Sequence, residues 1–210
     1  MKRIEFWFDP ISPFAYLAFE RLPQVLEGCS YWVDYHPVLF AGLLQHWGQK
    51  GPAEMPSKRA WTFRHVNWMA AQHGIEMQTP AVHPFNPLAL LRLAVACGPN
   101  RHVVEALFHH VWRGGGADAN DPQRLAALTA RLAPPRDPQG EDVKRELREA
   151  TDEAIALGLF GVPSLRCDER LFWGLDALPM LRAALTGDPW FDGPAWDEQG
   201  RPRAGVVRRA

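Results

Sequence analysis

The chain has 210 residues, with 23 Lys and Arg against 24 Asp and Glu and a formal net charge of −1. Near-neutrality excludes the strong positive field expected of a nucleic-acid-binding protein or of one held on an anionic membrane. No apolar run reaches the roughly 20 residues that a bilayer-spanning helix needs, and the start of the chain lacks the apolar stretch of a signal peptide. A cytoplasmic location is the resulting expectation.

The first predicted elements form a β-α-β unit. Residues 2–8 predict a strand, because Ile4, Phe6 and Phe8 alternate onto one face. A helix is predicted to begin at Ser12-Pro13, since serine is a favoured N-cap and proline fits the first helical position. Residues 31–38 predict a second strand, which a right-handed crossover would place parallel to the first.

The middle of the chain predicts only helices. Their ranges are 58–73, 84–97, 101–112, 122–132 and 141–157. Two short strands over 163–166 and 171–173 are predicted to form a hairpin, followed by a helix over 176–185. The pattern favours an α/β fold, of the thioredoxin-like kind with an inserted all-helical domain. The expected boundaries are 1–45 and 140–185 for the thioredoxin-like domain, 46–139 for the helical insertion and 186–210 for an extended or disordered tail.

The first candidate site is the junction of the first strand and helix, at Ser12. Unpaired N–H groups and the positive end of a helix dipole stabilise an anion at such a place. A thiolate is such an anion, and a neighbouring hydroxyl could donate a hydrogen bond that lowers the pKa of the thiol. The alternative is that Ser12 is only an N-cap.

The second candidate is the segment around Val162-Pro163. Proline at the head of a short strand cannot donate to the ladder and often marks irregular backbone. A cis Val162–Pro163 bond would turn the main chain of Val162 toward an extended peptide ligand. An ordinary trans proline that begins a strand is the alternative.

Neither site contains a redox cysteine. The three cysteines, Cys29, Cys97 and Cys167, are far apart and none lies in a C-x-x-C motif, so no disulfide framework or zinc site is indicated. A dithiol oxidoreductase would need cysteine at the start of the first helix, where the chain has Ser12 and, three residues on, Ala15.

Three motifs together resemble one family. They are D-P-I-S-P-F-A-Y at 9–16, G-V-P-S-L at 161–165 and F-W-G-L-D at 172–176. In this order and spacing they resemble 2-hydroxychromene-2-carboxylate isomerases and kappa-class glutathione transferases, a branch of the DsbA-like thioredoxin superfamily. The likeness extends to about residue 185. It implies glutathione as cofactor, a small aromatic-derived substrate and a homodimer, with no nucleic acid, membrane or metal involved.

The resemblance also implies roles for individual residues. Ser12 matches the catalytic serine that hydrogen-bonds the sulfur of glutathione. Val162, just before Pro163, matches the residue whose main chain pairs with the cysteinyl part. The γ-glutamyl group corresponds to a site made by Trp173, Gly174, Leu175 and Asp176.

Further matches lie in the helical block. Gln49 falls where kappa-class members commonly have asparagine, although an exposed loop glutamine explains it equally well, and Lys58 matches a lysine that contacts glutathione. His83, Phe85 and Asn86 are expected on the side of the second substrate. Asn86 before Pro87 is also explained as a helix cap.

The function hypothesis that follows is a glutathione-dependent cis-trans isomerase acting on 2-hydroxychromene-2-carboxylate or a related keto acid of aromatic catabolism. A kappa-like glutathione transferase is the first alternative. A non-catalytic thioredoxin-like module that binds glutathione or a peptide is the second.

Overall fold

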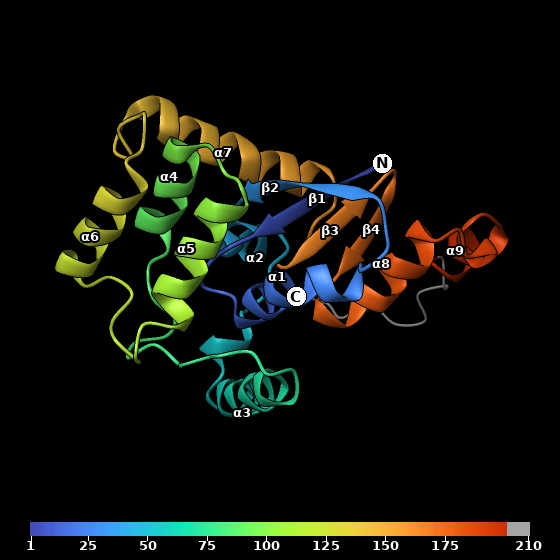
Figure 1. Ribbon diagram of the computed structural model, residues 1–210, viewed down its shortest axis with the longest axis horizontal. Helices are drawn as coiled ribbons and strands as arrows, with labels where there is room; N and C mark the ends of the chain where they lie inside the picture. The colour runs from blue at the N-terminus through green and yellow to red at the C-terminus, as the bar shows by residue number, and fades with distance from the viewer. Residues whose placement is uncertain (201–210) are drawn as a thin grey trace.

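A four-stranded mixed sheet forms the centre of the computed structural model, which describes residues 1–200 (Figure 1). The strand order is β2-β1-β3-β4. β1 (Lys2–Phe8) runs parallel to β2 (Tyr31–Pro37), and it runs antiparallel to β3 (Ser164–Cys167). β4 (Arg170–Trp173) completes a hairpin with β3. The predicted parallel β-α-β unit and the predicted hairpin are both confirmed.

Both faces of β1 are buried, because its side chains alternate between them. Phe6 and Phe8 belong to the larger core, which α1 (Pro13–Val25), α5 (Arg101–Trp112) and α8 (Leu178–Leu185) cover. Trp7 points the other way. It packs with residues of α2 (Phe40–His46) and α7 (Glu141–Ala156). Helices therefore cover the sheet on both sides, the arrangement of an α/β fold.

Five helices lie wholly inside the range expected for the helical insertion, and all four described strands lie outside it. These helices are η1 (Pro52–Glu54), α3 (Pro56–Gln72), α4 (Leu88–Cys97), α5 and α6 (Pro122–Leu132). Figure 1 shows α4, α5 and α6 grouped beside the β2 edge of the sheet, while α3 lies apart below. Within residues 1–200, no helix is both long and apolar enough to cross a membrane.

Three parts of the chain differ from the sequence-based expectation. α4 begins at Leu88 rather than at residue 84, because Pro84 and Pro87 lack an N–H and disfavour helical backbone before them. α2 was not predicted. The C-terminal segment was expected to be extended, but it forms η3 (Pro189–Phe191) and α9 (Pro194–Gln199). Phe191 and Trp196 pack there against Phe172, with ring centroids 6.1 and 5.8 Å away. Residues 201–210 of the expected tail lie outside the described residues.

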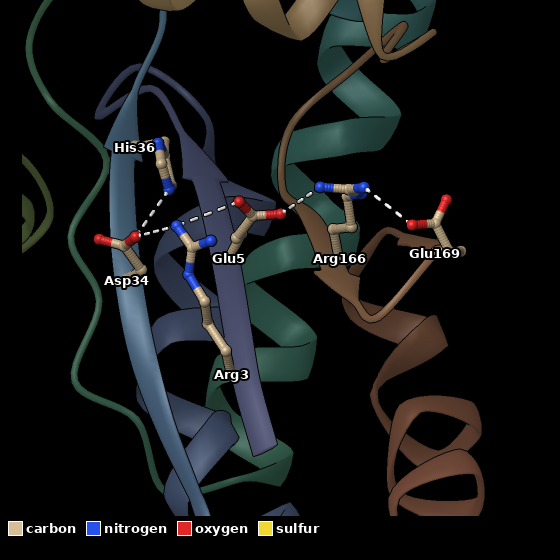
Figure 2. Close-up of polar contacts among 6 residues, drawn as sticks. All are labelled: Arg3, Glu5, Asp34, His36, Arg166 and Glu169. Atoms are coloured by element: carbon tan, nitrogen blue, oxygen red, sulfur yellow. Dashed lines mark hydrogen bonds and ion pairs between the residues drawn. The ribbon is translucent and has the colours of Figure 1, made fainter.

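A chain of charges crosses three adjacent strands at the level of Glu5, the middle residue of β1 (Figure 2). Glu5 of β1 is nearly buried and accepts a hydrogen bond from Arg166 of β3 at 2.9 Å. Arg3 lies 3.2 Å from the same carboxylate and pairs with Asp34 of β2 as well. These partners account for a buried carboxylate that would otherwise be a candidate for catalysis.

Replacing Arg166 with leucine is expected to lower the free energy of unfolding by about 2 kcal/mol, because the nearly buried Glu5 carboxylate loses one of its two arginine partners. Urea denaturation measures this loss. Arg145→Leu is the matched control, since Arg145 pairs with Glu149 on an exposed helix surface and should cost less than about 0.5 kcal/mol. Equal losses in the two variants would contradict the role given to Arg166.

Candidate active site

Ser12 lies at the end of β1 and caps α1, as predicted. Its Oγ accepts a hydrogen bond from the N–H of Ala15 at 3.2 Å and donates one to the carbonyl of Val162 at 3.2 Å. The residue is only 6% exposed. The fold thus brings together two predicted site residues that are 150 positions apart in the sequence.

The Val162–Pro163 bond is cis. The Pro163 carbonyl accepts a hydrogen bond from Gly174 N–H at 2.9 Å, which joins this segment to the predicted site for the γ-glutamyl group. No residue in the described part of the chain accepts a hydrogen bond from the N–H of Val162. An unpaired main-chain donor beside Ser12 is the kind of group that an extended peptide ligand pairs with.

Gly161 and Gly174 leave room for the side chains of Trp173 and Asp176. A Cβ atom on Gly161 would lie 2.6 Å from Nε1 of Trp173, which is half exposed. Gly174 has φ +96°, and a Cβ atom there would lie 2.5 Å from Oδ1 of Asp176. A side chain at either position would force Trp173 or Asp176 to move.

The turn before Ser12 contains a buried acid, Asp9, that the sequence analysis did not identify as a site residue. One carboxylate oxygen accepts the N–H of Ile11 and the other accepts the N–H of Phe40 at the start of α2, both at 3.0 Å. Burial raises the pKa of Asp9 to about 7, although the two amide donors act in the opposite direction. The signal in the sequence was the position of Asp9 in the turn, because an aspartate there commonly accepts the main-chain N–H of the residue two positions later, as in an Asx-turn.

Of the residues expected on the side of the second substrate, His83 contacts the same turn. His83 Nε2 is 2.8 Å from the carbonyl oxygen of Ile11, next to Ser12. Phe85 is buried, with its ring 6.0 Å from that of His83. The Asn86 side chain accepts the N–H of Leu88, the first residue of α4, at 3.0 Å, but the N-cap position is occupied by Pro87 and not by Asn86.

Gln49 and Lys58 lie just before and just after η1 in the sequence. Gln49 is exposed in the loop after α2, and Lys58 is exposed in the first turn of α3. Within residues 1–200, no hydrogen bond or ion pair joins either side chain to Ser12, Val162 or Asp176. Their contacts with a ligand stay predictions.

The raised pKa of Asp9 predicts a specific pH dependence of stability. Between about pH 4 and pH 7 the folded protein keeps a proton that the unfolded chain loses, so this contribution to stability falls as the pH rises. At about 1.4 kcal/mol per pKa unit, the total is at most roughly 4 kcal/mol. The amide introduced by Asp9→Asn does not titrate. The unfolding free energy of the wild type relative to Asp9→Asn should therefore decrease from pH 5 to pH 8, and a constant difference would contradict the prediction.

Comparison with known proteins identifies the family of the chain. A family model described as DSBA-like thioredoxin domain matches residues 3–186. The 2-hydroxychromene-2-carboxylate isomerase of Sphingobium xenophagum is 29% identical over 194 residues, covering 88% of this chain and 98% of the relative. Glutathione s-transferase kappa 2 of Caenorhabditis elegans is 26% identical over 215 residues, covering 92% and 95%.

Structural comparison gives the same result. A solved structure of a 2-hydroxychromene-2-carboxylate isomerase has a TM-score of 0.78 at 23% sequence identity, and the match covers 90% of this chain and 97% of that chain. The resemblance inferred from the three motifs is confirmed, and the chain belongs to the DSBA-like thioredoxin domain family, with relatives named as isomerases and as kappa transferases.

Proposed function

We propose that this protein is a glutathione-dependent isomerase of 2-hydroxychromene-2-carboxylate or a related aromatic-derived keto acid. The observation that carries the proposal is the pairing of the Ser12 hydroxyl with the main chain of Val162, whose N–H is unpaired within the described chain. Three curated relatives bear the name of this isomerase, at 27 to 29% identity. Relatives named kappa transferases support the use of glutathione.

The residues at the site fit a glutathione molecule. The Val162 main chain offers one donor and one acceptor to an extended peptide, as a neighbouring strand would. The Asp176 side chain lies against Gly174, and its carboxylate is suited to the ammonium of the γ-glutamyl group. Ser12 lies where the cysteinyl sulfur of such a peptide would need a partner.

When bound, glutathione supplies a thiolate that adds to an electrophilic carbon of the substrate and is later eliminated, so that rotation about the intervening bond becomes possible. Ser12 donates its hydroxyl hydrogen to the sulfur and so favours the thiolate over the thiol. The N-terminal end of α1 adds the positive end of its dipole. Ser12 itself does not attack the substrate.

A kappa-like transferase would use the same thiolate but would keep the adduct. Disulfide exchange by the protein's own thiols is not favoured, because Ala15 stands where a second cysteine would be and Cys167 lies opposite Ile4, at the far end of the sheet. A non-catalytic binding module would retain the Val162 edge but would need no pocket for a second substrate.

Steady-state assays separate the three functions. An isomerase is expected to consume the 2-hydroxychromene-2-carboxylate absorbance with catalytic glutathione, whose total concentration stays constant. Stoichiometric loss of glutathione with an electrophile would indicate a transferase. Binding without turnover of either substrate would indicate the module. If saturating glutathione neither binds in calorimetry nor raises the melting temperature, every function that depends on glutathione is wrong.

Replacing Ser12 with alanine is expected to raise the pKa of the bound thiol and to lower turnover at neutral pH by about tenfold, the equivalent of one pKa unit. The pH–rate profile should shift to higher pH by the same amount. Ser12→Thr retains a hydroxyl and an N-cap acceptor and should restore most activity. Ser30→Ala, an exposed serine before β2, is the control for serine removal. An unchanged pH–rate profile in Ser12→Ala would refute the role of the hydroxyl.

A further inference from the structure

Two aromatic rings of the helical block donate hydrogen bonds to consecutive carbonyls just before Ser12. Trp112 Nε1, at the last residue of α5, donates to the Pro10 oxygen at 2.9 Å. His83 Nε2, in the segment between α3 and α4, is 2.8 Å from the Ile11 oxygen. A carbonyl oxygen only accepts, so Nε2 of His83 carries the proton. The two donors come from positions 102 and 72 residues away from their acceptors.

Both rings are held in place by their surroundings. Trp112 is fully buried and lies parallel to the ring of Tyr16, with centroids 6.3 Å apart. The His83 ring meets Phe63 edge-on at 5.0 Å. Its Nδ1 is buried and has no hydrogen-bond partner in the described part of the chain. Burial and the nearby Arg59 charge lower the pKa of His83, which keeps the ring neutral with its proton on Nε2.

Ile11 is therefore held at both ends of the residue. Its N–H binds the Asp9 carboxylate on the sheet side, and its carbonyl binds His83 on the side of the helical block. The negative ends of the Pro10 and Ile11 carbonyl dipoles point to the two rings. Without these donors the two carbonyls could turn toward the N-terminus of α1, where their negative ends would oppose the stabilisation of an anion.

We propose that His83 and Trp112 are positioning residues, which direct the Ile11 and Pro10 carbonyls away from the Ser12 position and so favour a thiolate there. The buried Nδ1 of His83 has no surface on which to contact a substrate in this structure. His83 acts through Ile11. The thiolate in question is that of glutathione only if the proposed function holds, so the test uses a thiol that belongs to the protein.

Ser12→Cys places a thiol at position 12, and the pH dependence of its alkylation by iodoacetamide gives the pKa of this introduced thiol. Mass spectrometry of the peptide that contains position 12 distinguishes it from Cys29, Cys97 and Cys167. Adding His83→Leu is expected to raise the pKa of the introduced thiol by about one unit, so that alkylation slows about tenfold below that pKa. His83→Gln keeps an N–H donor at a similar reach and is expected to restore the pKa.

His110 provides a matched control within α5. Its Nε2 is also 2.8 Å from a carbonyl oxygen, that of Ala119, outside the turn before Ser12. His110→Leu should lower the melting temperature, as His83→Leu does, but should leave the pKa of the introduced thiol unchanged. Trp112→Phe removes only the N–H donor from a ring of similar shape. It provides the test if His83→Leu does not fold, and it too should raise the pKa of that thiol.

An unchanged pKa of the introduced thiol in both His83→Leu and Trp112→Phe would overturn the proposal and leave the two rings a purely structural role. Equal shifts in His83→Leu and His110→Leu would overturn it as well. Glutathione binding by the protein with Ser12 in place is measured separately by calorimetry. Absence of that binding would refute the proposed function, whereas alkylation of the Ser12→Cys variants would still decide the role of His83 and Trp112.

Discussion

Four polar groups in the turn from Asp9 to Ser12 form hydrogen bonds with distant segments of the chain. Asp9 binds the start of α2, Ser12 binds Val162, and the carbonyls between them bind Trp112 and His83. Buried polar groups must be paired, because an unpaired one costs on the order of 1–3 kcal/mol. The conformation of this turn therefore depends on four segments that fold onto it from both sides of the sheet. The site is a product of tertiary structure more than of its own short sequence.

Local rules were sufficient for the elements that carry the turn. The alternation in Ile4, Phe6 and Phe8 correctly predicted β1, and the Ser12-Pro13 pair correctly predicted the start of α1. The motifs that carry the family resemblance also lie next to one another in the structure. Ser12, Val162 and the segment ending at Asp176 are joined by Ser12 Oγ–Val162 and Gly174–Pro163 hydrogen bonds. Short-range periodicity and capping chemistry are encoded within a few residues, so a single sequence reveals them.

The rest depends on partners that no local pattern contains. α2 has only seven residues, and its N-cap Leu39 makes no side-chain hydrogen bond. The carboxylate that receives its first N–H belongs to Asp9, 31 residues earlier. The helical turns after residue 188 form where Phe191 and Trp196 meet Phe172 of β4. Likewise, the periodicity of α5 does not distinguish Trp112 from any other buried aromatic residue. Its role depends on the indole N–H, which reaches the Pro10 carbonyl only in the folded protein.

A serine at position 12 differs from a cysteine in what it requires of a ligand. Its hydroxyl has one hydrogen, which Val162 accepts here, while its oxygen already accepts the N–H of Ala15. In the proposed complex that hydrogen goes to the sulfur, and the Val162 carbonyl then loses its donor. A peptide thiol would compensate with its own main-chain N–H, and its carbonyl would pair with the N–H of Val162, which has no acceptor within residues 1–200. A simple thiol could do neither, so it would leave a buried carbonyl unpaired, which costs on the order of 1–3 kcal/mol. If the proposed function holds, this exchange of one hydrogen bond would favour the thiolate and would select for a peptide that carries it.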